Sequence, residues 1–301
     1  MSQATAPYIG TVPPEFRRPS RWATSWRAVT RKPGRVIGVV ILLFFALMAL
    51  FGPLLYPEHL PINAALLYAP PSWAHPLGTD FEGSDVLAEL ITGSRYVLSA
   101  AALAAVFTIG FGTVAGVVSG YFLGRTDTVI MRVTDFILTI PSFPLLIVLS
   151  TIWSFGSPIA MGLVLGLTGW GGLARAVRSQ TLSLRERGFI EAARGLGLSN
   201  IHIMTREILP NIAPYIAMNL LLSVTGGIYA EVGLFFLGVI PFQANNWGVM
   251  LNLAFNNGAL YTPQSLLYMI SPMVCILLVT FGIVLTLDAV DEILNPRLRE
   301  A

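Results

Sequence analysis

Residues 191–210 read EAARGLGLSNIHIMTREILP, a polar and basic stretch that lies between two strongly apolar segments. Charged side chains are costly in hydrocarbon, so this part of the chain is expected outside a bilayer. The charges in and just before it are Arg185, Glu186, Arg187, Glu191, Arg194, Arg206 and Glu207. The chain therefore alternates between segments suited to lipid and a loop that is not.

The same stretch predicts a helix–turn–helix loop. Good helix formers fill residues 182–194, and Gly195 and Gly197 then interrupt the helix. Ser199 or Asn200 can cap a second short helix, which we expect to end at Pro210. The small pair Ala192 and Ala193 would give the first helix a bare face on which another surface could approach closely.

Composition places the whole chain in the membrane class. Of its 301 residues, 54% are hydrophobic and only 11% are charged, against about a quarter charged in soluble domains. The mean hydropathy is +0.71. The single cysteine, Cys275, excludes a disulfide framework. We expect no cleavable signal peptide, because the first 35 residues are polar and basic and the following apolar run is long enough to stay in the membrane.

Six apolar runs are long enough to cross a bilayer, at about 20 residues each. They lie at 34–55, 95–121, 129–153, 157–175, 212–237 and 266–289. Prolines and glycines interrupt the third and fourth runs, which membrane helices tolerate where neighbouring groups satisfy the freed backbone. The predicted fold is an all-α integral membrane protein with six transmembrane helices.

Charge placement predicts the orientation. Arginines and lysines concentrate in the N-terminal tail, in the connection after the fourth span and at the C-terminus, whereas the connection 56–94 is acidic until Arg95. Under the positive-inside rule both termini and the 191–210 stretch face the cytoplasm. The basic excess is thereby explained by topology, so we expect no nucleic-acid partner.

The stretch 191–210 resembles the EAA loop of the inner-membrane subunits of binding-protein-dependent ABC importers. The resemblance rests on Glu191, Ala192, Ala193, Gly197, Leu209 and Pro210, which fall at the positions of that motif. Glu207 departs from it, because the motif prefers an apolar residue there. By this resemblance, the loop couples the chain to an ATPase.

Other passages narrow the resemblance to the dipeptide, oligopeptide and nickel permeases, and the basic N-terminal tail points to their C-type subunit. The similar passages are 75–95, 230–238, 246–251 and the ending Asn295-Pro296-Arg297-Leu298. The resemblance runs from about residue 30 to the end. It implies a type I ABC importer permease fold with a cytoplasmic tail (1–33), a first helix and outer connection (34–94), a permease core (95–290) with the coupling loop at 185–210, and a C-terminal tail (291–301).

The resemblance also implies the partners: a second permease subunit, two cytoplasmic ABC ATPases, an extracytoplasmic substrate-binding protein and membrane lipid. The location would be a prokaryotic cytoplasmic membrane. The chain has no GxxxxGK[ST] phosphate loop, so we expect no cofactor here, with ATP and magnesium bound by the ATPase subunits. No catalytic set is visible, and the chain is not expected to be an enzyme.

The cargo and its path remain open at this level. Short peptides are expected, with oligosaccharides or nickel as alternatives, and an ion-driven secondary transporter is the alternative from another class. Glu231 and Trp247 are candidates for a gate or cargo path, although a structural role for Glu231 is favoured. The polar segment 241–257 could meet a binding protein, line the entry, or be a solvated re-entrant loop. The scattered residues His59, His75 and His202 do not suggest a shared metal site.

Overall fold

The computed structural model describes residues 30–56, 62–153, 155–240, 245–261 and 263–294. Every regular element in these ranges is helical. The elements are α2 (Pro33–Leu55), η1 (Ala64–Leu66), α3 (Val86–Phe122), α4 (Gly124–Thr139), α5 (Ser142–Ile152), α6 (Pro158–Arg185), α7 (Gly188–Gly195), α8 (Asn200–His202), η2 (Ile203–Ile208), α9 (Leu209–Phe236), α10 (Trp247–Asn256), η3 (Pro263–Ser265) and α11 (Leu266–Leu294).

The predicted membrane architecture is confirmed. Within the described residues five helices are long and apolar enough to cross a membrane, and the α4–α5 pair gives a sixth span if it is counted as one. The predicted span 129–153 is therefore not a single straight helix, because the two parts meet at an angle of 83°. The break falls at Ile140 and Pro141, where proline removes an amide donor and disfavours helical geometry in the residue before it.

Several helices are longer than the sequence predicts. α3 begins at Val86 rather than at 95, because Asp85 caps it by accepting bonds from the amides of Leu87 and Ala88. α6 continues past residue 175 to Arg185. α11 continues to Leu294 and so takes in the first residues of the predicted tail at 291. The tail residues 1–29 and 295–301 lie outside the described ranges.

α3 and α6 form the centre of the bundle and pack through glycines. A Cβ placed on Gly116 would lie 2.6 Å from the carbonyl oxygen of Ala174, and one on Gly162 would lie 2.6 Å from the Cβ of Leu103. Small residues let helix backbones approach closely where lipid gives no hydrophobic driving force. The glycine spacing in α3 therefore serves helix packing.

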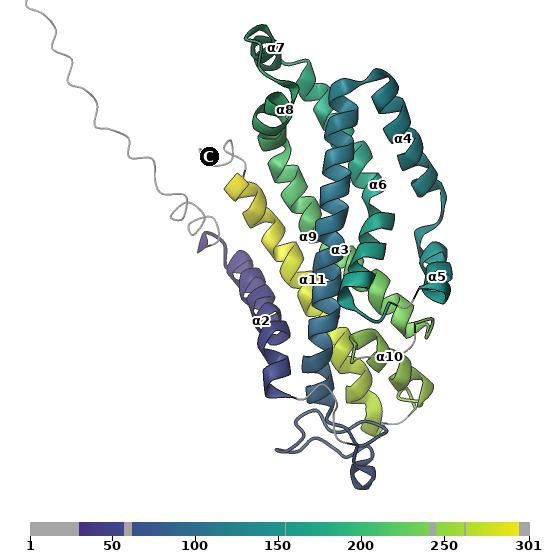
Figure 1. Cartoon of the computed structure of the whole chain (residues 1–301). Coiled ribbons are helices and arrows are strands. Elements are labelled where there is room, and N and C mark those ends of the chain that lie inside the picture. The colour runs from purple at the N-terminus through teal and green to yellow at the C-terminus, as the bar shows by residue number, and fades with distance from the viewer. Residues whose placement is uncertain (1–29, 57–61, 154, 241–244, 262, 295–301) are drawn as a thin grey trace, which may run out of the picture.

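α2 lies at the side of the bundle against α11 (Figure 1). Gly38 and Gly282 form the close approach, and a Cβ on either would contact the other helix at 3.0 Å or less. At one end of this pair Arg31 donates to Glu292 at 3.0 Å, and Arg35 forms a second ion pair with the same carboxylate. Backbone contact and charge together hold α2 in place.

The two ends of the bundle differ in content. α7, α8, the start of α2 and the end of α11 lie at one end, and the connection 62–85 lies at the other (Figure 1). The basic coupling loop and the acidic connection therefore lie at opposite ends of the bundle.

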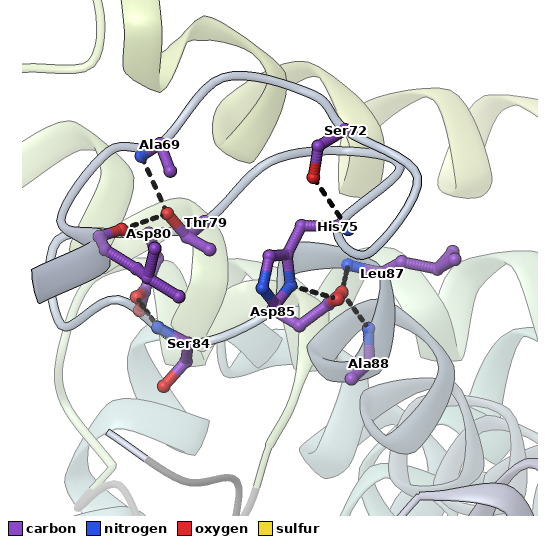
Figure 2. Close-up of polar contacts among 10 residues, drawn as sticks. Ala69, Ser72, His75, Thr79, Asp80, Ser84, Asp85, Leu87 and Ala88 are labelled. Atoms are coloured by element: carbon purple, nitrogen blue, oxygen red, sulfur yellow. Dashed lines mark hydrogen bonds and ion pairs between the residues drawn. The ribbon is translucent and has the colours of Figure 1, made fainter. Parts of the chain in front are cut away.

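The connection 62–85 is held by its own polar contacts (Figure 2). The Thr79 hydroxyl accepts from the Ala69 amide at 2.8 Å, and one Asp80 oxygen accepts from the Ser84 amide at 2.7 Å. His75 Nδ1 lies 2.8 Å from the Asp85 carboxylate. Burial, and then the nearby Asp80 carboxylate, raises the pKa of Tyr68. These contacts make the connection an ordered structure that leads directly into α3.

Candidate functional site

The first arm of the coupling loop (residues 185–210) is α7. Glu191 lies in its first turn, where a negative charge is favourable beside the helix dipole. The helix ends in a Schellman turn: the amides of Gly197 and Leu198 donate to the carbonyls of Arg194 and Ala193 at 2.9 and 3.2 Å. Gly197 has φ +74°, a conformation that glycine adopts without strain. The predicted glycine break is therefore present, with Gly197 as the residue that requires it.

The two alanines of the motif face in different directions. Ala193 is 5% exposed and packs with Ile190 in an apolar cluster that also contains residues of α3 and α6. Ala192 and Glu191 are exposed. The prediction that both alanines form one bare face is wrong, because successive helix residues point about 100° apart. Ala193 seats α7 on the bundle, and Ala192 lies on the outer surface.

The second arm does not end at Pro210, contrary to the prediction. α8 continues through the π-helical segment Ile203–Ile208 into α9, and Pro210 lies in the first turn of α9. A proline ring clashes with the carbonyl four residues earlier in a regular α-helix, and the wider π turn lets the helix continue. Leu209 is half-buried beside the apolar cluster, and Pro210 is exposed.

Tyr121, which the sequence did not single out, contacts both arms of the coupling loop. Its hydroxyl donates to Asn200 Oδ1 at 2.8 Å. The Arg194 guanidinium lies over its ring, 5.3 Å from the centroid, within the range of a cation–π contact. Tyr121 is 5% exposed and belongs to the same apolar cluster as Ala193.

A polar cluster close to Tyr121 joins α3 to α4 and α6. Arg178 of α6 donates from Nε and Nη2 to the two oxygens of Asp127 in α4, each at 2.6 Å. The Ser119 hydroxyl of α3 donates to the same carboxylate. A bidentate arginine–carboxylate pair is geometrically specific, so it fixes α3, α4 and α6 relative to one another. Nothing in the residue spacing of these segments indicates this contact.

Glu231 and Trp247 lie toward the opposite end, and both are fully buried. Asn246 Nδ2 donates to Glu231 Oε1 at 2.7 Å, while Asn246 Oδ1 accepts from the Gly248 amide and so caps α10. Trp247 Nε1 donates to the Leu90 carbonyl of α3 at 2.9 Å. In this conformation the two side chains hold α10 against α9 and α3 and do not line a surface.

The segment 241–257 is therefore not a solvated loop where it is described. Residues 241–244 lie outside the described ranges, and the remainder is mostly the packed helix α10. Asn252 shows the use of its polar residues: it donates to the Phe236 carbonyl at 2.7 Å, where α9 ends. Asn246 and Asn257 also bond backbone groups at the ends of α10, so much of the polar character of the segment serves to complete helix ends.

The histidines of the described residues lie apart. His75 is in the connection 62–85, and His202 is in α8 at the other end of the bundle (Figure 1). His59 is outside the described ranges. Among the described residues no three His, Cys, Asp or Glu side chains form a group that could hold a metal ion.

Comparison with known proteins gives two family matches. Residues 112–300 match the model described as "Binding-protein-dependent transport system inner membrane component". Residues 20–71 match the N-terminal transmembrane domain of oligopeptide transport permease C.

Individual relatives agree with these matches. The oligopeptide transport system permease protein OppC of Mycobacterium tuberculosis is 38% identical over 204 residues, which are 67% of this chain and 69% of the relative. The dipeptide transport system permease protein DppC of Bacillus subtilis is 34% identical over 243 residues, 78% of this chain and 75% of the relative. The oligopeptide permease OppC of Bacillus subtilis is 29% identical over 267 residues, 88% and 86% of the two chains.

Proposed function

The chain belongs to the family of binding-protein-dependent transport system inner membrane components, and from this premise we propose that it carries short peptides through an ABC importer. Its role as the multi-pass permease of such an importer follows from the family. An importer of this kind works with an ATPase and a binding protein. The peptide cargo is supported by relatives that are named as oligopeptide and dipeptide permeases. Oligosaccharides and nickel are the alternative cargoes to be tested.

The complete assembly is proposed to contain a second permease subunit, two cytoplasmic ATPases and one extracytoplasmic binding protein. The surface of α9 supports the second subunit. Most residues of α9 between Pro214 and Thr225 are only half-buried within this chain. A helix face that the chain covers only in part can pack against another membrane helix. ATP and magnesium are proposed to bind to the ATPase subunits, and no cofactor is expected in this chain.

The coupling loop is proposed to face the cytoplasm, together with both chain termini. The support is that the basic coupling loop and the basic start of α2 both lie away from the acidic connection 62–85 (Figure 1), as the positive-inside rule expects of a cytoplasmic side. The chain before α2 and after α11 would then lie on the cytoplasmic side, and the connection 62–85 would face the binding protein.

The single observation that best supports coupling is the exposed surface of a firmly seated α7. Ile190 and Ala193 bury one side of it. The other side presents Glu191 and Ala192, with exposed apolar residues around them: Phe189, Leu196 and Ile201. An apolar surface outside the membrane, on a short helix with a small residue, suits insertion into a groove of an ATPase. Gly197 would set the angle between the two arms, and Leu209 and Pro210 would set how the second arm continues into α9.

Glu231 and Trp247 are proposed to stabilise the outer closure of the permease. Both hold α10 in place through buried hydrogen bonds at 2.7 and 2.9 Å. Opening a path at this end would require these contacts to change, so the two residues would act in the gate without contacting cargo while it is closed.

Reconstitution tests the function directly. The permease is co-expressed with its second subunit, its ATPases and its binding protein, and the complex is placed in lipid vesicles. We expect ATP-dependent accumulation of labelled di- to pentapeptides. Accumulation of a labelled disaccharide or of Ni²⁺ without peptide uptake would overturn the cargo assignment and leave the permease assignment standing.

A further inference from the structure

We propose that Tyr121 is a positioning residue that joins the coupling loop to α3, so that a displacement of α7 by the ATPase moves α3 directly. This inference rests on the proposed role of the loop in meeting an ATPase. It adds a lateral connection to the two covalent connections that the loop makes with α6 and α9.

The contacts of Tyr121 fall on both sides of the glycine turn. Arg194 lies in the last turn of α7, and Asn200 begins α8. One buried side chain therefore contacts the first arm through its ring and the second arm through its hydroxyl, at 5.3 Å and 2.8 Å. If the two arms move together, they must either carry Tyr121 with them or break both contacts.

Both covalent connections of the loop are irregular. Glu186 and Arg187 interrupt the helix between α6 and α7. On the other side, the chain reaches α9 through the π-helical segment Ile203–Ile208, an element that often marks a functional irregularity in a helix. The turn between the arms has few contacts, because Leu196 is 80% exposed and a Cβ on Gly197 would meet no atom within 4 Å. A lateral contact can therefore transmit a displacement that these irregular connections would partly absorb.

The helix that Tyr121 joins is well suited to carry a displacement. α3 is one helix of 37 residues. Near Tyr121, Ser119 links it to the Asp127–Arg178 pair, and so to α4 and α6. Near its other end, the Leu90 carbonyl accepts from Trp247 of α10. A shift of the coupling loop that moves α3 would therefore reach the contacts that close the opposite end.

The test uses Tyr121→Phe, which keeps the ring and its packing but removes the hydroxyl. Tyr215→Phe is the matched control: Tyr215 packs against the same apolar cluster, and its hydroxyl makes no hydrogen bond among the described residues. The complete complex is reconstituted in vesicles with its binding protein. The wild-type complex is first tested with a labelled tripeptide, a labelled disaccharide and Ni²⁺. The cargo that it accumulates is then used for all variants. The readouts are cargo transported per ATP hydrolysed and the amount of ATPase that co-purifies.

We expect Tyr121→Phe to lower transport per ATP about fivefold. The net contribution of one hydrogen bond changes the ratio of two conformational populations by about this factor. ATPase co-purification should stay at the wild-type level, and Tyr215→Phe should behave as wild type. Wild-type transport per ATP in Tyr121→Phe would overturn the inference. Loss of ATPase co-purification would also overturn it, because the residue would then act in assembly.

A double-mutant cycle tests whether Tyr121 and Asn200 act through the hydrogen bond that joins them. Asn200→Ala removes the acceptor of the same hydrogen bond, so the double variant Tyr121→Phe/Asn200→Ala should lose no more coupling than either single variant. Independent, multiplicative losses would show that the contact does not act as a unit and would reject the proposal. Failure of the wild-type complex to couple ATP to transport would instead reject the proposed function.

Discussion

Replacing Gly116 by alanine tests whether α3 and α6 form one rigid unit. The added methyl carbon would lie 2.6 Å from the Ala174 carbonyl oxygen and 2.7 Å from the Val177 Cβ, whereas ordinary contact begins at 3.4 Å. The nearest atom belongs to the backbone, so no side-chain rotation relieves the contact. The two helices would have to separate locally by roughly 0.8 Å.

The control for this substitution is Gly110→Ala on the same helix, where a Cβ would meet nothing within 4 Å. Both variants gain about 0.5–1 kcal/mol from replacing glycine inside a helix. Only Gly116→Ala also has the cost of overpacking, about 1–3 kcal/mol. The difference between the two variants therefore isolates the packing term, because the propensity term cancels.

The measurement is the unfolding free energy of the purified full chain in mild detergent, followed by titration with a denaturing detergent. We expect Gly110→Ala to be as stable as wild type or more stable, and Gly116→Ala to be less stable than Gly110→Ala by about 1–3 kcal/mol. Equal stabilities for the two variants would refute the close contact between α3 and α6 and the interpretation of the glycine spacing.

Three further predictions concern the two ends of the bundle. Trp247→Phe should destabilise the protein by about 1 kcal/mol, because the Leu90 carbonyl loses a buried donor; an unchanged thermal midpoint would contradict this. Glu191→Lys should abolish transport and ATPase co-purification while membrane insertion remains normal, since it reverses an exposed charge on α7; normal uptake would argue against docking there. A cysteine that replaces Trp73, which is 104% exposed, should react with an impermeant thiol reagent from outside intact cells, and a cysteine that replaces Ser199 should not. Labelling at Ser199 would reverse the proposed orientation.

The sequence predicted the spans because hydrophobic length is a local property. Each predicted run matches a helix or the bent α4–α5 pair and extends beyond it by one residue at most, and the basic coupling loop lies at the end opposite the acidic connection. The Gly197 turn was also predictable, since the left-handed backbone conformation favours glycine. By contrast, the 83° bend of α4–α5 could not be obtained from Pro141 alone, because proline marks a break without fixing its angle.

The contacts that organise the candidate site were not predictable for a different reason. Tyr121 and Asn200 are 79 positions apart, and Asp127 and Arg178 are 51 apart. Such pairs carry no periodic signal, and one sequence does not show which distant polar residues meet. The sequence singles out Glu231 as a gate or cargo-path candidate, but it leaves open the role of the polar segment that contains its partner Asn246. Sequence thus located the polar residues, and only the fold assigned their partners.

The distribution of these contacts indicates how the two ends can communicate. The polar contacts between helices described above lie toward the ends of the bundle, through Asp127 and Tyr121 at one end and through Glu231 and Trp247 at the other. Between the ends, α3 and α6 are joined by glycine packing, which leaves little room for sliding because packed interiors deform poorly. α9 also packs closely on α3, since a Cβ on Gly227 would lie 3.1 Å from the Ala101 Cα. The contacts at the two ends, rather than sliding within the bundle, are therefore expected to decide which arrangement is held during transport.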